Sequence, residues 1–425
     1  MSAPQKQYDL FVWGSTGFSG SLLCELLVKT YRPGSTTLKY CIGGRDISRM
    51  ERLRKRLIDV LNKETKTNDG EDIISSIPMF VCNNEDELSK CIANSKVCLT
   101  FAGPFSESGE NVVKLCCEHY TNYVDVSGEF LWIKRMQRIY GASVASKGLK
   151  FVMGSGFTST VADLGLLHLQ NFAAQTSGLP CQEVLHYEEH IGHKPEPSYG
   201  TVKSIFAYTD ETEEEKSVDD PYFLCNGKLC LSNIEEIINK NRVSERPVYN
   251  SLVQSWTTPN LFSHYNSSYV HFSNEEMGYP YGMDFVFSSR SLNGSYLSAI
   301  TGSLSRTISN IALKSQIFLK MLRCTAYYVF GEGPDITKAQ GKVFKSFFVG
   351  TTMQGKSYKC TITASDIEEY GITAITALSS CLAIIFDGDL LPQTYGMSSP
   401  SCLLGTFAIK HCQDLGLQFD VEHLQ

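Results

Sequence analysis

Several features are scarce in this sequence of 425 residues, and each scarcity excludes a class of protein. Basic charge is scarce: the formal net charge is −7, so no basic field attracts phosphate backbones, and we expect no nucleic acid partner. A close-spaced framework of cysteines is absent as well, although Cys116 and Cys117 are adjacent. The 15 cysteines are scattered along the chain, which is typical of reduced thiols in a cytoplasmic protein and not of a small disulfide-stapled secreted domain.

Long apolar runs are also scarce. The N-terminus passes from a short polar tail into a strand-like run and has no signal-peptide pattern. The most apolar long stretch, Tyr370–Phe386, is shorter than the roughly 20 residues of a spanning helix and contains two threonines and two serines. We therefore expect no transmembrane helix, and a buried helix over residues 371–386.

The rhythm of apolar segments predicts an α/β protein with two domains, since single cores stop growing at about 250–300 residues. Short apolar runs alternate with amphipathic segments up to residue 153, which is typical of βαβ units on a parallel sheet. We expect a Rossmann-type doubly wound parallel sheet in a dinucleotide-binding domain, residues 1–155. An α+β domain for substrate binding and dimerisation is expected over 156–425. The six expected strands are Tyr8–Trp13, Lys39–Ile42, Pro78–Cys82, Val97–Phe101, Asn122–Val126 and Lys150–Met153.

Local signals predict where some elements begin. Ser48 with Glu51, and Asn84 with Glu87, each place a capping side chain three residues before an acidic partner and predict helix starts. The polar residues 62–72 are expected to form a surface loop. Further helix and strand patterns cover residues 156–169 and 342–362.

A glycine motif follows the first expected strand directly. The sequence Gly14-Ser15-Thr16-Gly17-Phe18-Ser19-Gly20 leads into an expected helix, an order that is typical of dinucleotide-binding loops. The first glycine permits the tight turn, the second lets the backbone approach the pyrophosphate, and the third allows close helix packing. The alternative is an ordinary turn. The residues expected to contact the cofactor here are Gly14, Ser15, Thr16, Gly17, Phe18 and Gly20.

The end of the second expected strand bears on the choice of cofactor. An arginine at this position suits the 2′-phosphate of NADP, whereas a carboxylate accepts the ribose hydroxyls of NAD. The strand is followed by Gly43-Gly44-Arg45-Asp46. We expect Arg45 to bind the 2′-phosphate of NADP. NAD stays the alternative, with Asp46 on its ribose and Arg45 as a solvent-facing residue.

The fourth and fifth strands also end in small residues where open α/β sheets bind ligands. Ala102, Gly103 and Pro104 follow the fourth strand, and Ser127 and Gly128 follow the fifth. We expect these five residues to line the cofactor site. Ordinary turn chemistry would explain each segment by itself.

Taken together, these motifs resemble the saccharopine dehydrogenase-like oxidoreductases, a family that includes the mycobacterial trans-acting enoyl reductases. The resemblance implies a Rossmann domain, a mixed α+β domain and an NAD(P)-linked redox role, tied in some members to lipid or glycolipid synthesis. It does not imply saccharopine as the substrate. The segments that carry it are Gly14 to Gly20, Gly44-Arg45, Gly103-Pro104-Phe105, Tyr123 to Glu129, Gly154-Ser155-Gly156-Phe157 and Ala162-Asp163-Leu164-Gly165.

Departures from the family pattern occur as well. Thr158 and Val161 stand where the family often has Asp and Pro. An apolar stretch that some relatives carry is interrupted here by Arg290, Asn293 and Arg306. This interruption weighs against attachment to a lipid droplet or a membrane surface, which stays the alternative to a purely cytoplasmic location.

Two short motifs suggest chemistry in the second domain. His186-Tyr187-Glu188-Glu189-His190 fits H-x-x-E-H, but this zinc motif works on a helix, and the resemblance implies a strand here. We expect no metal, with His190 and the nearby His193 as candidate proton donors. Tyr199 and Lys203 fit the Y-x-x-x-K dyad of short-chain dehydrogenases, although Gly200 and nearby prolines predict a loop.

The leading hypothesis is an NAD(P)-dependent oxidoreductase that reduces an apolar, lipid-related substrate with an unsaturated bond or a carbonyl group. Lys203, Tyr199 and His190 are the candidate catalytic residues. We expect a homodimer that acts on a small molecule. The alternatives are a non-catalytic, cofactor-bound scaffold and a zinc hydrolase.

Overall fold

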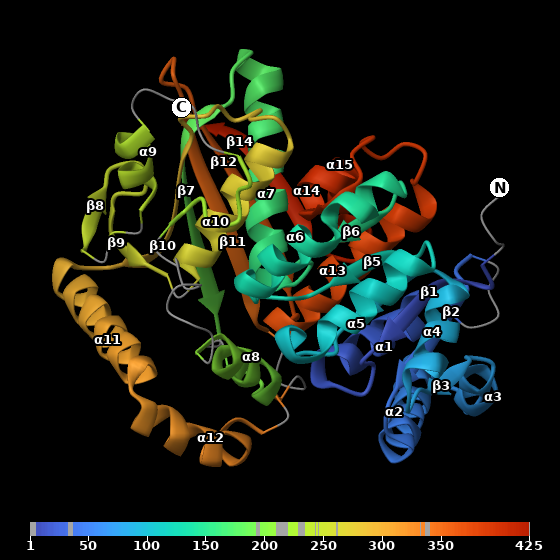
Figure 1. The fold of residues 1–425 in the computed structure, drawn as a ribbon. Helices are drawn as coiled ribbons and strands as arrows, with labels where there is room; N and C mark the ends of the chain where they lie inside the picture. Colours follow the sequence, from blue (N-terminus) through green and yellow to red (C-terminus); the bar gives the residue numbers. More distant parts are fainter. Residues whose placement is uncertain are drawn as a thin grey trace. The chain divides into compact units, whose positions relative to one another are not determined.

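The computed structural model describes residues 6–32, 37–192, 196–209, 220–227, 234–242, 244, 246–260, 262–331, 333–335 and 341–424. The chain forms two compact units (Figure 1). Unit 1 comprises Met1–Phe157 and Glu369–Leu415, and unit 2 comprises Thr158–Glu368 and Gly416–Gln425. Each unit is therefore built from two separate stretches of sequence.

Unit 1 contains a seven-stranded parallel sheet in the order β13-β6-β5-β4-β1-β2-β3. The strands β2 and β3 are added on one side of β1, and β4, β5 and β6 are added on its other side. This reversal of the strand order beside β1 is the switch point of a Rossmann fold. The predicted fold class and all six predicted strands are confirmed. The strands are β1 (Tyr8–Trp13), β2 (Tyr40–Gly44), β3 (Met79–Val81), β4 (Ser95–Thr100), β5 (Asn122–Asp125), β6 (Lys150–Val152) and β13 (Gly396–Ser398).

Helices connect these strands in the pattern that parallel pairing requires. They are α1 (Phe18–Thr30), α2 (Ile47–Thr65), α3 (Gly70–Ser75), α4 (Glu85–Ala93), α5 (Phe105–Glu118) and α6 (Phe130–Ser146). The predicted start of α4 is confirmed, because Asn84 Oδ1 accepts from the Glu87 amide at 2.9 Å. The Glu87 carboxylate returns a bond by accepting from the Asn83 amide at 2.6 Å.

Two local predictions about α2 are wrong. The capping side chain is Asp46, which accepts from the Arg49 amide at 2.9 Å, and Ser48 lies inside the first turn. Residues 62–72 do not form one loop, since α2 continues to Thr65 and α3 begins at Gly70. The helices form because apolar residues on either side of this polar stretch pack into the core: Leu61 of α2 and Ile74 of α3 are fully buried.

The C-terminal stretch of unit 1 supplies β13 and the helices α13 (Glu369–Phe386), α14 (Pro400–Leu404) and α15 (Thr406–Asp414). The expected buried helix is α13, which packs against α1, β4 and β5. The predicted boundary at residue 155 assigned this helix to the second domain, whereas its contacts group it with unit 1. Among the described residues α13 alone has the length and apolarity of a membrane span, and 61% of it is buried.

Unit 2 is the expected α+β part, with a mixed sheet in the order β14-β12-β11-β7-β10-β9-β8. β7 and β10 run parallel, and the other pairs are antiparallel. The strands are β7 (Cys181–Ile191), β8 (Val248–Asn250), β9 (Ser255–Pro259), β10 (Val286–Asn293), β11 (Val343–Thr352), β12 (Ser357–Ser365) and β14 (Gln418–Leu424). The helices are α7 (Phe157–Ser177), α8 (Tyr199–Thr209), α9 (Ile234–Asn241), α10 (Ser263–Glu276), α11 (Tyr296–Lys314) and α12 (Gln316–Phe330).

Candidate functional site

The glycine loop lies between β1 and α1, at the carboxyl edge of the sheet of unit 1 (Figure 1). Gly14 has a φ of +77°, and a Cβ there would lie 2.7 Å from the Ala102 nitrogen. A Cβ on Gly20 would lie 2.4 Å from the Gly14 carbonyl oxygen. The fold itself therefore requires the first and third glycines of the motif: one for the turn, the other for the close packing of α1 on the loop.

Ser15 holds the loop to the neighbouring strand. Its hydroxyl donates to the Gly43 carbonyl at 2.9 Å, and its side chain is fully buried. The Ser15 side chain thus fixes the end of β2 relative to the loop. Thr16 and Phe18 are half-buried, and the Phe18 ring packs edge-on against Tyr370 of α13 at 5.0 Å between centroids.

Three other glycines at this edge are not required by the fold. Gly17 is exposed, has a φ of −75°, and a Cβ there would touch only the Gly14 oxygen at 3.4 Å. Gly103 is exposed as well, and the nearest atom to a Cβ would be 3.5 Å away. A Cβ on Gly128 would meet nothing within 4 Å. They follow β1, β4 and β5, which are adjacent in the sheet, so a shared external neighbour would explain all three.

The N-terminus of α1 is free to receive an anion. Its N-cap residue is Gly17, no side chain caps it, and its first turn contains no acidic residue. By contrast, Asp46 caps α2, and Glu129 accepts from the Phe105 and Ser106 amides of α5, each at 2.8 Å. The backbone N–H groups of an uncapped helix start and the helix dipole both favour a phosphate.

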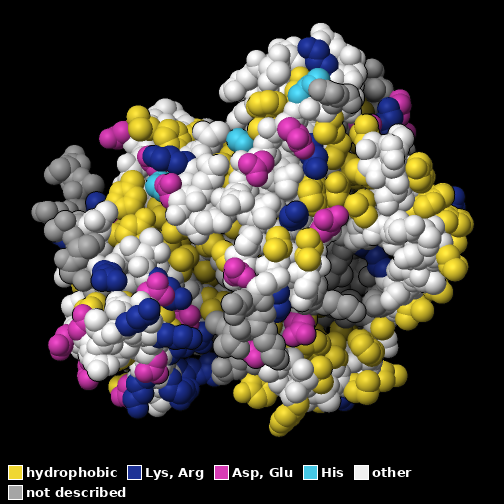
Figure 2. Space-filling view, turned by 180° about the vertical axis from the view of Figure 1, so that it is seen from behind, with side chains coloured by type: hydrophobic (Ala, Val, Ile, Leu, Met, Phe, Trp, Pro, Cys, Tyr) yellow, Lys and Arg dark blue, Asp and Glu magenta, His cyan; other side chains and the backbone are white. Residues whose placement is uncertain are grey.

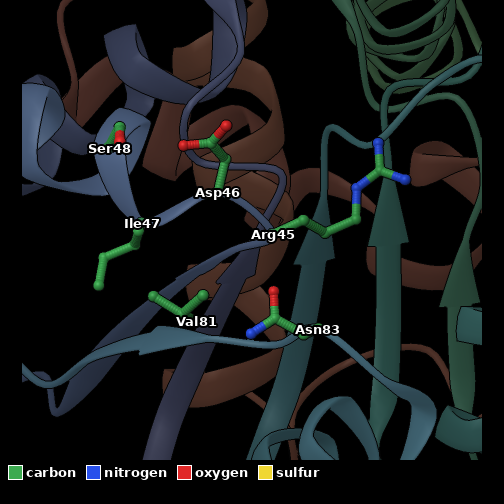
Figure 3. A pocket seen from close by; sticks show the side chains of 6 residues that line it. All are labelled: Arg45, Asp46, Ile47, Ser48, Val81 and Asn83. Atoms are coloured by element: carbon green, nitrogen blue, oxygen red, sulfur yellow. The ribbon is translucent and has the colours of Figure 1, made fainter.

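The end of β2 opens into a surface hollow of about 490 Å³ lined by Arg45, Asp46, Ile47, Ser48, Val81 and Asn83 (Figure 3). Arg45 is exposed, and its side chain extends away from Asp46. The Asp46 carboxylate instead faces its own helix. The bond from the Arg49 amide lowers the pKa of Asp46, so one oxygen of this carboxylate is already engaged as a cap.

The turn after β5 is held by two buried carboxylates that the sequence analysis did not single out. Asp125 Oδ1 accepts from the amides of Ser127 at 2.9 Å and Gly154 at 2.7 Å. Burial raises the pKa of Asp125 to about 6, even though both amide bonds favour the charged form. Glu129 links this turn to the start of α5 through its two bonds to that helix.

All the predicted cofactor-binding residues therefore lie along one edge of one sheet. The segments that carry them follow β5, β4, β1 and β2, which are consecutive in the sheet order. Ser127 has its side chain buried against the Glu129 amide at 3.2 Å, and Pro104 is the N-cap of α5, so these two shape the turns. Arg45 and the glycines Gly17, Gly103 and Gly128 are the exposed members.

The predicted catalytic residues lie in unit 2. Tyr199 and Lys203 are one turn apart on α8, so the prediction of a loop is wrong. The Ser198 hydroxyl accepts from the Thr201 amide at 3.2 Å at the start of this helix. The Lys203 ammonium lies 5.5 Å from the centroid of the Tyr199 ring, a cation–π arrangement. His190 is on β7, half-buried, with its ring 5.3 Å from that of Phe344, and His193 lies outside the described residues.

The H-x-x-E-H sequence lies on a strand, as the resemblance implied. His186 and His190 belong to β7, where four residues span roughly 13 Å, too far for both to bind one zinc ion. His186 is fully buried between the hydroxyls of Ser289 at 2.8 Å and Ser346 at 2.9 Å. Burial lowers the pKa of His186 to about 3. In the described part of the chain no three His, Cys, Asp or Glu side chains could hold a metal together.

Known proteins resemble this chain over its full length. No family model matches it. It is 23% identical to a trans-acting enoyl reductase from Mycobacterium ulcerans over 435 residues, 98% of each chain. It is 29% identical to a saccharopine dehydrogenase-like oxidoreductase from Mus musculus over 175 residues, which covers 40% of this chain and 39% of that protein.

A solved structure shares the fold. Apo saccharopine dehydrogenase (L-Glu forming) from Saccharomyces cerevisiae superposes with a TM-score of 0.53 at 11% identity, covering 98% of this chain and 100% of that one. The Rossmann order of the sheet agrees with this likeness. The resemblance expected from the motifs is thereby confirmed, and the chain is a homologue of the saccharopine dehydrogenase-like oxidoreductases and the trans-acting enoyl reductases.

Proposed function

We propose that this chain is an NADP-dependent oxidoreductase that reduces a carbonyl group or a carbon–carbon double bond in an apolar, lipid-related small molecule. The observation that carries the proposal is the set of Gly17, Gly103 and Gly128. Each is exposed at the carboxyl end of a neighbouring strand, and neither φ nor internal packing requires a glycine there. A dinucleotide that lies across these three strand ends requires the bare backbone, because a Cβ would occupy its place.

The surroundings of Arg45 favour NADP over NAD. The Asp46 carboxylate, which could serve the ribose hydroxyls of NAD, already uses one oxygen as the cap of α2. Arg45 extends into the solvent, with the Ser48 hydroxyl and the Asn83 amide in the same hollow (Figure 3). The exposed cations Arg49, Arg52, Arg54 and Lys55 on α2 add a positive field, visible as the dark blue group at the lower left of Figure 2. An additional phosphate is therefore stabilised here more than a free hydroxyl.

When bound, the nicotinamide supplies the hydride, and the chain must position it and stabilise the charge that develops on the substrate. Asp125 and Glu129 fix the turns after β4, β5 and β6 that would border the nicotinamide half. The Tyr199 hydroxyl and the Lys203 ammonium are the groups proposed to stabilise developing negative charge, with His190 as a further proton donor. The proposed location is cytoplasmic, and the proposed assembly is a homodimer.

A substitution of Gly17 tests the proposal. Gly17→Val adds a branched side chain whose Cβ touches only the Gly14 oxygen, at 3.4 Å, so the variant should fold, yet the side chain occupies the place of the pyrophosphate. Saturating NADPH should raise the unfolding free energy of the wild type by about 2.7 kcal/mol at a hundredfold excess over Kd, and that gain should vanish in the variant. Gly141→Val is the matched control, because a Cβ on Gly141 in α6 would meet nothing within 4 Å. Undiminished stabilisation of folded Gly17→Val would refute the site.

A further inference from the structure

Two thiols lie side by side in unit 1, between the end of β3 and the helix α4. The Sγ atoms of Cys82 and Cys91 are 3.8 Å apart, which is a hydrogen-bond distance for sulfur. Cys82 directly follows β3, and Cys91 lies near the end of α4. Both cysteines are free thiols, and the proposed function uses neither of them. The fold therefore holds two reactive sulfurs close enough for a small movement to join them.

The pair is accessible from the solvent through a surface hollow of about 410 Å³ that both cysteines line. Cys82 is 3% exposed and Cys91 is 7% exposed. A second pair provides the contrast, because Cys98 and Cys116 also share a hydrogen bond but are both fully buried. Oxidation of a thiol depends on its exposure, so a small oxidant reaches the first pair more readily than the second.

The two thiols differ in which of them keeps its proton. The hydrogen bond to Cys91 is the largest cause that raises the pKa of Cys82, and burial adds to it. Cys82 therefore stays protonated and donates its S–H to the Cys91 sulfur. Because the thiolate is the nucleophile in cysteine oxidation, Cys91 is the sulfur that attacks an oxidant, and Cys82 is the sulfur that completes the bond.

A bond between these sulfurs acts on the hollow that contains Arg45. The Cys82 amide donates to the Gly44 carbonyl at 2.9 Å, directly before Arg45. The next residue, Asn83, lines the hollow (Figure 3). The sulfurs of a disulfide are about 2.05 Å apart, so the two sulfurs must approach each other by about 1.8 Å. Asn83 lies inside the ring of residues 82–91 that the bond closes, and it is therefore displaced by this movement.

We propose that Cys82 and Cys91 form a site of reversible oxidation, at which a peroxide joins the two sulfurs in a disulfide and thereby weakens the binding of NADPH. Formation of the disulfide depends on the two thiols alone, whereas its effect on NADPH rests on the proposed function. In a reducing compartment a disulfide of this kind is transient, which is typical of redox sensors.

The oxidation balances with hydrogen peroxide as the oxidant. The deprotonated Cys91 sulfur attacks one peroxide oxygen, the O–O bond breaks, and a sulfenic acid forms on Cys91 while the released hydroxide takes up a proton. The Cys82 sulfur then attacks the Cys91 sulfur, and the S–O bond breaks as the S–S bond forms. The leaving hydroxide takes the thiol proton of Cys82. The two sulfurs have then lost two electrons, and the peroxide has become two water molecules.

Mass spectrometry of the full-length protein tests whether the disulfide forms. The reduced wild type is treated with hydrogen peroxide without cofactor, alkylated and digested. We expect a linked Cys82–Cys91 peptide that dithiothreitol separates, while Cys98 and Cys116 stay reduced. Cys91→Ala should abolish the link, and alanine suits a buried helix position. The matched control is Cys324→Ala, which removes an exposed cysteine of α12 and should leave the link intact. Absence of the link in the wild type would overturn the proposal.

Calorimetry with NADPH tests the effect on the cofactor after the peroxide has been removed. The affinity of the oxidised wild type should be roughly 2- to 12-fold lower than that of the reduced protein, which corresponds to the loss of one hydrogen bond. Dithiothreitol should restore it. Peroxide should leave the affinity of Cys91→Ala unchanged, whereas Cys324→Ala should respond like the wild type. Equal affinities of the reduced and the disulfide-linked wild type would overturn the effect on NADPH. A reduced protein that binds no NADPH contradicts the proposed function, whereas the disulfide is judged from the linked peptide.

Discussion

The glycines along the carboxyl edge of the sheet in unit 1 belong to two groups. At Gly14 and Gly20 a side chain would collide with backbone atoms of the chain itself. At Gly17 and Gly103 a Cβ would make only ordinary contacts, at 3.4 Å and 3.5 Å, and at Gly128 it would meet nothing within 4 Å. The first group shapes the edge, and the second leaves room beside it. This separation identifies the residues at which the proposed cofactor contact can be tested, which the sequence spacing of the motif cannot do.

Arg45 is the residue on which the choice between NADP and NAD depends. We expect Arg45→Ala to weaken NADPH binding by roughly 10- to 150-fold, because a charge-assisted bond to a phosphate contributes about 1.5–3 kcal/mol. NADH affinity should change by less than about twofold, since NADH has no 2′-phosphate. Isothermal titration calorimetry with both cofactors measures this. The matched control is Arg138→Ala, which removes an exposed arginine of α6 that does not line the hollow. Equal losses for NADPH and NADH would contradict the assignment.

Single residues were predicted from the sequence only where their role depends on immediate neighbours. Arg45 was singled out because it directly follows an apolar strand, and Gly17 because it precedes a helix, and both cofactor roles stay predictions. Asp125 and Glu129 were not singled out, although the resemblance included their segment. Their partners are amides at Gly154 and Phe105, 29 and 24 residues away, and no local pattern shows which turns will meet.

At the scale of elements, Glu129 joins two loops of the candidate site. Both oxygens of its buried carboxylate accept amide bonds from the first turn of α5. Glu129→Gln keeps the shape but places an amide nitrogen against one of those N–H donors. We expect the unfolding free energy of unit 1 to fall by about 1–3 kcal/mol and NADPH binding to weaken. Denaturant unfolding with and without NADPH measures both effects.

Glu107→Gln is the control for this substitution, because Glu107 lies in the same first turn of α5 and is exposed. It should change the unfolding free energy by no more than about 0.5 kcal/mol. If both variants unfold like the wild type, the carboxylate bonds contribute nothing, and Glu129 does not hold the turn.

Elements with strong periodicity were predicted, and those that depend on tertiary contacts were not. The strands of unit 1 are short apolar runs between amphipathic helices, so their number and order followed from the sequence. Helix α8 was missed because Gly200 and the prolines before it suggested a loop. Val202 and Phe206 pack on α12, and this tertiary packing outweighs the local propensity. The observed cap of α2 lies two residues before the predicted one. Asp46 and Ser48 are both good capping residues, and only the path of the backbone decides which of them caps the helix.

At the scale of the whole molecule, the two units do not follow the order of the chain. β13 completes the parallel sheet beside β6, and α13 covers β4 and β5, although both come more than 200 residues after those strands. The sequence identified α13 as a buried helix, but its apolar residues would fit any core. A run of alanine, leucine and isoleucine does not indicate which sheet the helix covers. The prediction of a boundary at residue 155 therefore did not include the later stretch that packs on unit 1.

The units also bury titratable groups with opposite responses to acid. In unit 2 burial lowers the pKa of both His186 and His271 to about 3, below the ordinary value of 6.5. Acid protonates these histidines in the unfolded chain first, so their contribution to stability is lost as pH falls from about 6.5 toward 3. In unit 1 burial raises the pKa of Asp125 to about 6, above the ordinary 3.8. The cost of burying its charge is present above pH 6 and is relieved as pH falls toward 4.

Lowering the pH from 7 to 5 should therefore separate the unfolding of the two units. At about 1.4 kcal/mol per pKa unit, the two histidines together cost unit 2 about 4 kcal/mol at pH 5, while Asp125 returns about 1 kcal/mol to unit 1. Fluorescence distinguishes the units, because Trp13 and Trp132 belong to unit 1 and Trp256 to unit 2. In a Trp256→Phe background the signal should report unit 1 and persist at denaturant concentrations where circular dichroism already shows unit 2 unfolded. Asp125→Asn keeps an acceptor for both amides and should abolish the gain in stability of unit 1 at pH 5. If the fluorescence and circular dichroism transitions coincide at both pH 7 and pH 5, these buried groups do not control the stability of either unit.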